Sequence, residues 1–537
     1  MGFLLSKKPF YAVIILLLFA LVQDPATFSL EENQRHAASL TRSSLNLDAI
    51  TTEDDNQTAP WAFISNILLS TRDIPYPHHV EPTLAVSDDG TLFVGYKNAE
   101  THNGGGARVS FTKSTDNGLH WTPPSDMPHF GGLNTRQSDP WMVWKNGTLY
   151  YAYLEYRTGF DELDPFSQIT LARSEDAGAQ WALSTASHGN QFADKETMAV
   201  SGDGNTVFVV YDDVGPSTDV RLSRSIDGGG TFQDISTISD IPHNGHVGPY
   251  IALDSQENLY TAWTWFNASN NLGDIYLDVS LDQGETFTTE WDVNPEADAS
   301  AFEETFDGST YRPAKVTLPV ISFDAHDRLY LLWADLHEPY GTWDVYLRYS
   351  DNYGIDWSPR LLVNPFTPGN QWMPDMAIDS SGRVHIAWLN ELSTGSYRPY
   401  YRNVLFGPDN QHEPQWSTVI PIANQWTPSN FTRPGDYLTI RVDSQDNPHV
   451  VWSDGRDGEM DIYYSHANVT TLPAEPSTNS TQSTIPVPSA STSSASLTAE
   501  SEASSAPGFT LALLLGVFFA VMTVRRAKQH FKSRAAP

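Results

Sequence analysis

The sequence predicts an all-β protein in which similar units form a seven-bladed β-propeller, with a six-bladed ring as the alternative. The first observation is a short β-branched and aromatic segment that occurs seven times and always ends in a large aromatic residue, at Tyr96, Tyr153, Tyr211, Trp263, Trp333, Trp388 and Trp452. The second is a Gly, Asn or Asp turn before these segments. The third is that apolar residues in this region never keep the period of a helix for long.

Each unit supplies the strands of one blade in the same order. An apolar segment comes first, as in PTLAV from Pro82 or PVISF from Pro319, and the aromatic-ended segment follows the turn. A third segment, such as DVYLRYS, comes after a loop. A fourth strand then completes an antiparallel meander, and four-stranded meanders repeated around an axis are the blades of a propeller.

The final unit lacks a fourth strand, because its pattern stops at DIYYSH, which ends at His466. The segment WAFISNILLS, from Trp61 to Ser70, is a strand pattern ahead of the first unit that has no unit of its own. We predict that this N-terminal strand completes the last blade, since closing the ring removes exposed strand edges. The predicted propeller spans residues 59–469.

Four nearly identical turns follow the third segments of the first four units: STDNGLHW, SEDAGAQW, SIDGGGTF and SLDQGETF. Their Ser and Asp side chains can hydrogen-bond to the local backbone, and their Gly allows a positive φ. A fifth copy, SDNYGIDW, has Asn352 in place of the Asp. The pattern resembles the Asp-box, and with it residues 59–469 resemble the sialidase (neuraminidase) or BNR-repeat superfamily of propellers. The resemblance implies that these turns lie on the face opposite the substrate site, which gives a structural role to Asp116, Asp176, Asp227 and Asp282.

The same resemblance implies catalytic candidates on the loops of the other face. A sialidase holds a sugar carboxylate with three arginines and uses a tyrosine activated by a glutamate as nucleophile, with an aspartate as acid and base. The arginines would be Arg136, Arg312 and Arg433, the tyrosine would be Tyr437, and Glu100 lies nearest the expected acid/base position. The chain departs from the family in its TRDIP segment, where Asp73 interrupts the Arg-Ile-Pro motif, and in having seven units where sialidases usually have six.

These departures favour binding without catalysis. We expect recognition of extracellular glycans or glycoproteins, because aromatic faces stack on sugars and the chain has 16 tryptophans, although each of these can instead pack between blades. The candidate ligand-binding residues are Asp139, Asp194, Trp265, Trp372, Asp436 and Arg456, with Trp141 near the same channel mouth. An exo-glycosidase of sialidase type is the first alternative, and a protein-interaction scaffold with a flat or filled channel mouth is the second.

No cofactor is required by this interpretation. Asp139, Asp194 and Asp436 are oxygen ligands of the kind that a structural Ca²⁺ ion prefers, and a solvated acidic rim explains the same residues. We expect no zinc, because His78 and His79 are adjacent while His243 and His246 share a loop, without the spacing of zinc ligands.

The charge and the two ends of the chain indicate an exported, surface-bound protein. A net charge of −34 argues against a nucleic-acid partner, since it repels polyanions. Residues 1–24 have the basic start and apolar run of a signal peptide or N-terminal anchor, and residues 25–58 are expected to be flexible. Residues 470–506 form a Ser/Thr/Pro-rich stalk, and residues 507–537 are an apolar segment with a basic tail that the positive-inside rule places in the cytoplasm.

The Pro507-Gly508-Phe509 tripeptide, with the stalk before it and the apolar segment and basic tail behind it, resembles the PGF-type sorting signal of archaeal surface proteins. Such proteins are cut and lipid-anchored there, in the manner of a GPI signal, and an ordinary single-span tail anchor is the alternative. Six Asn-X-Ser/Thr sequons agree with an exported glycoprotein, at Asn56, Asn146, Asn267, Asn430, Asn468 and Asn479. We therefore expect a monomer on the extracellular face of the cell membrane.

Overall fold

The computed structural model describes the chain from Phe63 to Asn468 with gaps. The described residues are 63–71, 76–100, 106–130, 135–157, 167–187, 192–215, 218–239, 245–267, 272–294, 300–301, 318–337, 342–365, 369–392, 396–407, 413–428, 435 and 437–468. The predicted segments 1–24, 25–58, 470–506 and 507–537 lie outside them. Every regular element in the described part is a β-strand, and it contains no helix that could cross a membrane.

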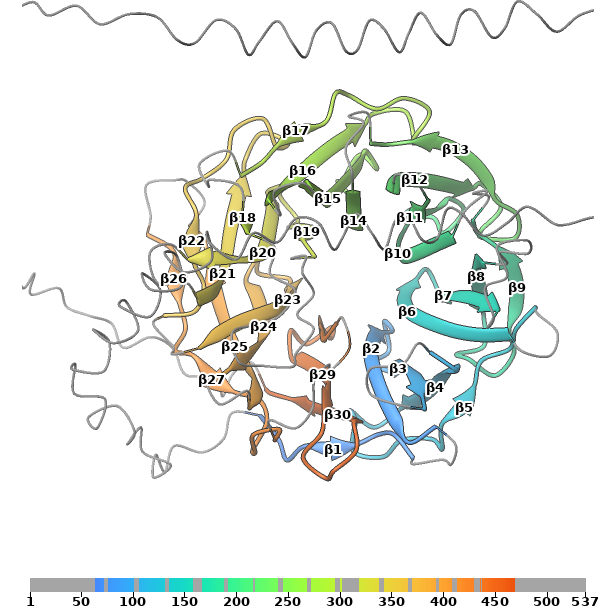
Figure 1. The fold of residues 1–537 in the computed structure, drawn as a ribbon, viewed down its shortest axis with the longest axis vertical. Helices are drawn as coiled ribbons and strands as arrows, with labels where there is room; N and C mark the ends of the chain where they lie inside the picture. Colours follow the sequence, from blue (N-terminus) through green and yellow to red (C-terminus); the bar gives the residue numbers. More distant parts are fainter. Residues whose placement is uncertain are drawn as a thin grey trace, which may run out of the picture. The chain divides into compact units, whose positions relative to one another are not determined.

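Seven small antiparallel sheets form a ring, and each sheet is one blade (Figure 1). Blade one contains β2 (His78–Val86), β3 (Leu92–Ala99), β4 (Arg108–Ser114) and β5 (Ser125–Asp126). Blade two contains β6 (Thr135–Lys145), β7 (Thr148–Arg157), β8 (Ser167–Ser174) and β9 (Ala182–Thr185). Blade three contains β10 (Phe192–Val200), β11 (Val207–Val214), β12 (Thr218–Ser225) and β13 (Gln233–Thr237). The next two are β14 (Gly245–Leu253), β15 (Leu259–Asn267), β16 (Leu272–Ser280) and β17 (Trp291–Asp292), with β18 (Ser300–Ala301) also on β16; and β19 (Val320–Phe323), β20 (Leu329–His337), β21 (Thr342–Ser350) and β22 (Leu361–Leu362).

The sixth blade is β23 (Asn370–Ile378), β24 (Val384–Glu391), β25 (Tyr397–Leu405) and β26 (Gln415–Trp416), with β27 (Ile420–Pro421) also on β25. The seventh is β28 (Thr439–Val442), β29 (Pro448–Asp454) and β30 (Asp461–His466), completed by β1 (Ile67–Leu68). The first strand of each blade is the innermost, and these inner strands surround the centre of the ring. The prediction of seven blades rather than six is confirmed.

The N-terminal strand closes the ring as predicted. Ile67 and Leu68 of β1 pair antiparallel with Tyr464 and Tyr463 of β30, and Phe63 forms a further bridge to Ala467. The Leu69 amide donates to the Ile462 carbonyl at 2.8 Å. The first described strand therefore completes the blade that the last strands of the propeller begin.

The repeated aromatic residues form the core between blades. All seven landmarks, from Tyr96 to Trp452, are on the second strand of their blades, and each side chain is fully buried. Burying such large rings on every blade removes a large apolar area from water, which is the main stabilising term in folding. The repeat in the sequence is thus a packing repeat.

The repeated Ser/Asp turns connect third strands to fourth strands, as expected. At the end of β12, Ser225 Oγ donates to Asp227 Oδ1 at 2.7 Å and accepts the Gly229 amide at 2.8 Å, while Asp227 Oδ1 accepts the Thr231 amide at 2.8 Å. Gly229 has a φ of 87°, which other residues rarely adopt. The turns after β4, β8, β16 and β21 have equivalent bonds. In the last of these, Asn352 Oδ1 accepts the Asp356 amide at 2.9 Å, so an amide oxygen replaces the carboxylate oxygen.

Asp227→Asn is expected to keep most of the stability of its turn, because Asn352 already makes the corresponding bonds in the fifth copy. Asp227→Ala removes the acceptor of three hydrogen bonds, from the Ser225 hydroxyl and from the Thr231 amide and hydroxyl, and is expected to lower the free energy of unfolding by roughly 1 kcal/mol. Thermal unfolding of both variants tests this. Equal losses for Asn and Ala would show that the acceptor oxygen is not what holds the turn.

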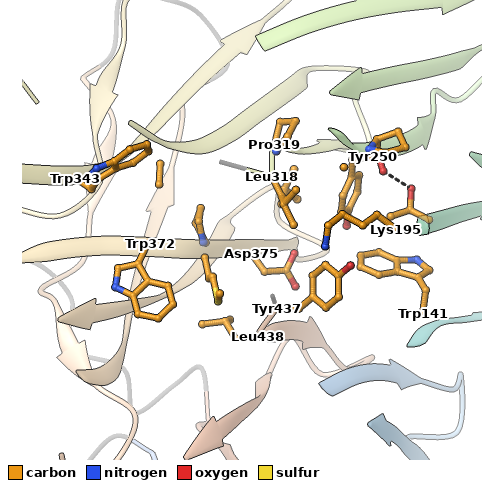
Figure 2. Close-up of a pocket in the computed structure, with 17 residues that line it drawn as sticks. Trp141, Lys195, Tyr250, Leu318, Pro319, Trp343, Trp372, Asp375, Tyr437 and Leu438 are labelled. Atoms are coloured by element: carbon orange, nitrogen blue, oxygen red, sulfur yellow. Dashed lines mark hydrogen bonds between the residues drawn. The ribbon is translucent and has the colours of Figure 1, made fainter. Parts of the chain in front are cut away.

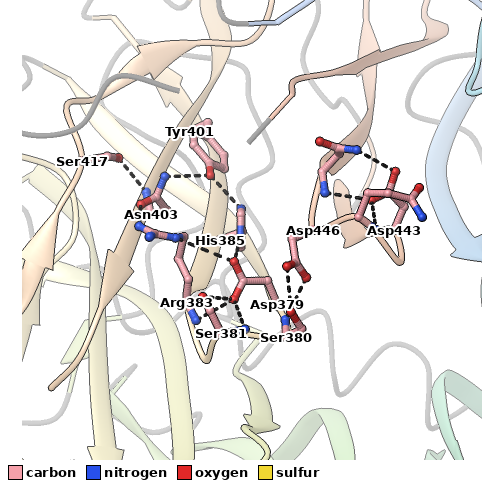
Figure 3. Close-up of polar contacts among 12 residues, drawn as sticks. Asp379, Ser380, Ser381, Arg383, His385, Tyr401, Asn403, Ser417, Asp443 and Asp446 are labelled. Atoms are coloured by element: carbon pink, nitrogen blue, oxygen red, sulfur yellow. Dashed lines mark hydrogen bonds and ion pairs between the residues drawn. The ribbon is translucent and has the colours of Figure 1, made fainter. Parts of the chain in front are cut away.

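Blades six and seven contain matching Asp-His-Tyr links that begin at the turns between their first two strands, and Figure 3 shows the link of blade six. His385 Nε2 lies 3.0 Å from Asp379 Oδ2, and its Nδ1 lies 2.7 Å from the Tyr401 hydroxyl. Since an ionised carboxylate only accepts, His385 Nε2 donates to Asp379, and Nδ1 is the ring atom that meets the Tyr401 hydroxyl. Asp443, His449 and Tyr464 repeat the arrangement. The Ser380 amide and hydroxyl donate to Asp446 at 2.9 and 2.7 Å, which ties blade six to blade seven.

This network predicts a loss of stability in acid. Burial alone would raise the pKa of Asp379, but hydrogen bonds from His385, Ser381 and the Arg383 amide outweigh it and lower the pKa to about 2. Because the folded pKa is below the unfolded value of about 4, the contribution is present above that pH and is lost as the pH falls toward 2. We expect Asp379→Asn to lower the free energy of unfolding at pH 7 by about 2 kcal/mol and to flatten its change between pH 4 and pH 2. Urea unfolding across this range measures both effects.

Asp219→Asn, at a half-buried aspartate outside the network, is the matched control and should change little. An Asp379→Asn variant with wild-type stability at pH 7 and the wild-type acid slope would contradict the prediction.

Candidate functional site

A repeated irregularity of the innermost strands positions the candidate site. The pairing register of β2, β6, β10, β14 and β23 with the next strand shifts at one point in each. The residue at each shift has a positive φ: Glu81, Asp139, Lys195, Gly248 and Met373. Such bulges re-aim side chains and are common next to active sites. Five blades therefore bend their inner strands at the same level of the channel.

A pocket with a cavity volume of about 60 Å³ opens at the level of these bulges. Its walls come from inner segments of blades two to seven (Figure 2). Five aromatic side chains line it: Trp141, Tyr250, Trp343, Trp372 and Tyr437. Leu318, Met373 and several prolines add aliphatic surface, while the polar lining side chains are Lys195, Thr197 and Asp375. A largely apolar pocket with few polar groups is typical of a ligand site.

One polar cluster lies at the blade-two and blade-three side of this pocket. The Tyr437 hydroxyl donates to Asp139 Oδ1 at 3.1 Å, and Lys195 Nζ lies 3.8 Å from the same oxygen. Lys195 Nζ also lies 5.5 Å from the centroid of the Tyr437 ring, within the range of a cation–π contact. The bulges at Asp139 and Lys195 bring these groups together from separate blades.

Two buried carboxyl groups lie near this cluster. Burial raises the pKa of Glu196 well above its ordinary value, and the nearby Asp139 adds to the shift. Burial also raises the pKa of Asp212, although Asp212 Oδ2 accepts the Gly248 amide at 2.9 Å. Both environments favour the uncharged carboxyl.

A second ionic group forms another part of the pocket wall. Asp375 is 4% exposed, and its Oδ2 accepts Arg441 Nη1 at 2.8 Å and the Ile440 amide at 2.9 Å. The Arg441 guanidinium lies 5.7 Å from the Trp141 ring centroid, and Trp141 meets Tyr250 edge-on at 5.3 Å. Burial raises the pKa of Asp375, while Arg441 opposes the shift.

The structure brings some of the predicted site residues together. Tyr437 and Trp372 line the pocket, Asp139 is bonded to Tyr437, and Asp194 precedes Lys195 in β10. Arg312, Arg433 and Asp436 lie outside the described residues.

Other predicted residues lie away from the pocket lining. Arg136 makes a two-pronged ion pair with Glu100, at 3.0 and 2.5 Å, and its Nε donates to the Gly106 carbonyl. Trp265 packs edge-on against Tyr276 in blade four.

Arg456 links blade seven to neighbouring segments. It bonds to Asp454 at 2.5 Å, to Asn424 at 2.6 Å and to Asn66 at 3.1 Å. These contacts join the seventh blade to the segment after β27 and to the segment before β1.

The predicted Ca²⁺ site cannot be traced in full, because one of its three predicted ligands, Asp436, is not described by the structure. No three acidic or histidine side chains among the described residues converge as they would around a metal ion. The Ca²⁺ prediction includes Asp436, which lies outside those residues, so it remains a prediction.

Sequence reasoning missed three residues that line the pocket, Lys195, Tyr250 and Trp343, and it missed Arg441, which pairs with the lining residue Asp375. One signal was present: Pro occurs inside the first apolar segment of most units, and proline in a sheet is found at edges and bulges. Reading these prolines as bulges would have directed attention to the residues beside them.

Comparisons with known proteins give structural relatives only. No family model matches the chain, and no curated protein matches it in sequence. A protein of unknown function from Dyadobacter fermentans is 15% identical, with a TM-score of 0.44, over 62% of this chain and 94% of that one. An ulvan lyase from a new polysaccharide lyase family is 9% identical, with a TM-score of 0.47, over 77% and 96%. The intramolecular trans-sialidase of Ruminococcus gnavus, solved with oseltamivir carboxylate, is 12% identical, with a TM-score of 0.42, over 77% and 99%. The chain is therefore a seven-bladed β-propeller by its own topology, and similar solved structures include sialidases.

Proposed function

We propose that the protein binds extracellular glycans or glycoproteins in the channel pocket and does not cleave them. The observation that carries the proposal is the lining itself, in which five aromatic side chains from different blades surround a small space containing few polar groups. Aromatic faces and a few fixed polar groups are what a sugar ring requires, because its own faces are apolar and its edges are polar. A protein-interaction scaffold was predicted to have a flat or filled channel mouth, and the presence of a pocket argues against this alternative.

The absence of cleavage is proposed from the state of Arg136. Its guanidinium, which would hold a sugar carboxylate in a sialidase, is occupied by Glu100 and the Gly106 carbonyl. A bidentate arginine pair is among the stronger side-chain interactions, so a ligand carboxylate would have to displace it.

A glycan array followed by calorimetry tests binding. Trp372→Ala is expected to weaken binding by roughly tenfold or more, because it removes an aromatic wall of the pocket. Trp144→Ala is the matched control: Trp144 is on the same strand as Trp141 but outside the pocket lining, with its Nε1 donating to Asp88. Absence of binding to every glycan, or equal effects of the two substitutions, would contradict the proposal.

An exo-glycosidase is the second candidate, favoured by the hydrogen bond from Tyr437 to Asp139. A carboxylate that accepts the proton of a tyrosine hydroxyl can activate it as a nucleophile. A panel of aryl glycosides, sialosides included, separates the candidates. Release of the aryl group that is lost in Tyr437→Phe would establish catalysis, and inactivity at every pH would leave binding.

We also propose that the chain is exported and held on the outer face of the cell membrane through residues 507–537. This rests on the sequence pattern of those residues. Removing residues 507–537 should release the protein from the membrane fraction into the medium. Continued membrane association of the truncated chain would contradict the proposal and direct attention to residues 1–24.

A further inference from the structure

The polar groups in the pocket wall differ in whether their hydrogen-bonding capacity is met. Thr197 Oγ1 donates to the Pro249 carbonyl at 2.9 Å, the contact drawn in Figure 2. Lys195 is engaged with Asp139 and the Tyr437 ring. Asp375 is different: its Oδ2 has two donors, but its buried Oδ1 has no hydrogen-bond partner within the described part of the chain.

An unmet carboxylate oxygen in a buried wall is unfavourable, and a ligand that donates a hydrogen bond to it relieves this penalty. Arg441 Nη1 does not meet this oxygen, because it donates to Oδ2 and to the Ile440 carbonyl. Asp375 is among the residues that line the pocket, so a ligand there lies beside this carboxyl group.

The charges around the pocket select against charged ligands. The described ionised side chains form two opposite pairs, Asp139 with Lys195 and Asp375 with Arg441. Glu196 and Asp212 are buried where the uncharged carboxyl is favoured. A carboxylate or sulfate on the ligand would come close to Asp375, whereas an ammonium group would come close to Lys195, since both side chains line the same small space. A balanced site leaves an uncharged hydroxyl as the best donor.

We propose that the pocket selects an uncharged sugar unit, with one hydroxyl donating to Asp375 Oδ1 and the ring faces held between the aromatic walls that include Trp141 and Trp372. This inference rests on the proposed glycan-binding function and names its ligand class. It differs from the anionic sugar that the resemblance to sialidases implies. Asp375 acts here as a specificity-determining residue that touches the ligand.

Calorimetry with methyl glycosides of glucose, galactose, mannose and fucose tests the ligand class, with methyl glucuronide, N-acetylneuraminic acid and methyl glucosaminide as charged counterparts. The uncharged glycosides are expected to include the tightest ligand, with the charged ones bound at least about tenfold more weakly. Tightest binding of an acidic or amino sugar would overturn the inference while leaving glycan binding intact. Absence of binding by any sugar would instead overturn the proposed function, and the inference with it.

Asp375→Asn tests the contact, with an expected loss of about tenfold or more in affinity for the tightest glycoside. Asp454→Asn is the matched control, because Asp454 is also a buried aspartate paired with an arginine but lies outside the pocket lining. It should leave affinity unchanged. Wild-type affinity in Asp375→Asn, or equal losses in both variants, would overturn the contact.

A ligand-side measurement keeps the test valid even if Asp375→Asn fails to fold. Monodeoxy analogues of the tightest glycoside, bound to the wild-type protein, should include one whose missing hydroxyl reduces affinity about tenfold. If Asp375→Asn folds, that analogue should bind this variant as tightly as the parent glycoside does, because the contact made by the hydroxyl is already lost. Uniform binding of all monodeoxy analogues would overturn the inference.

Discussion

Deleting residues 63–70 is expected to unfold the propeller or to make it aggregate. The deletion removes the strand that covers β30, so the last blade would present an open edge to other chains. It also removes Phe63 and Leu69, which are 3% and 4% exposed, and the buried bond from Ser70 Oγ to Asp461 Oδ1. Each large apolar side chain lost from a core lowers the free energy of unfolding by about 2–5 kcal/mol, against a total of roughly 5–15 kcal/mol for a folded protein.

A pair of adjacent substitutions tests the same strand without a deletion. Leu69→Ala is expected to lower the free energy of unfolding by about 3 kcal/mol, because the side chain is buried against blade one and blade seven. Leu68→Ala, at a side chain that is 45% exposed, should change it by less than about 0.5 kcal/mol. Denaturant unfolding compares the two, and equal losses would mean that the strand is not packed as described.

Arg441→Met is expected to produce the second large loss, about 3 kcal/mol. It removes the charged partner of the buried Asp375 carboxylate and leaves the Ile440 amide as the remaining donor to Oδ2. An isolated buried charge is much less stable than a paired one, and the group responds by taking up a proton. The loss should therefore shrink as the pH falls, since a protonated Asp375 needs no counter-charge.

The double variant Arg441→Met/Asp375→Leu is the control for this prediction. Replacing both members of a buried ion pair with apolar side chains is often neutral, so it should recover most of the stability lost in the single variant. Urea unfolding at pH 7 and pH 5 measures all three proteins. A double variant as unstable as Arg441→Met would show that lost packing, and not the unpaired charge, causes the effect.

The sequence contained enough information for the blades because the blades are local. Strand, turn, strand and the Ser/Asp turn recur within short stretches, and each buried landmark such as Trp333 is part of its own unit. The closing strand was also predictable. The last unit lacked a fourth strand and the chain began with a strand that belonged to no unit, so pairing the two completes the ring.

The pocket was only partly predictable, because its contacts join residues from different blades. Tyr437 and Trp372 were predicted from their position on the face where a ligand was expected, and both line the pocket. The pairing of Asp375 with Arg441 spans 66 residues and depends on how neighbouring blades pack. The pairing of Arg136 with Glu100 similarly depends on loop geometry that residue spacing does not encode.

The closure of the ring by β1 and β30 also determines when the fold can be completed during synthesis of the chain. The Ile462 amide donates to Ser70 Oγ across 392 residues of chain, so the earliest described strand cannot be paired until the last described strand, β30, has been synthesised. Contacts this distant in sequence form slowly, because the chain loses the entropy of closing a long loop before the contacts can stabilise it. Six blades are built from strands that are consecutive in the sequence, whereas the seventh is complete only when β1 pairs with β30, and an unpaired β30 is an exposed strand edge.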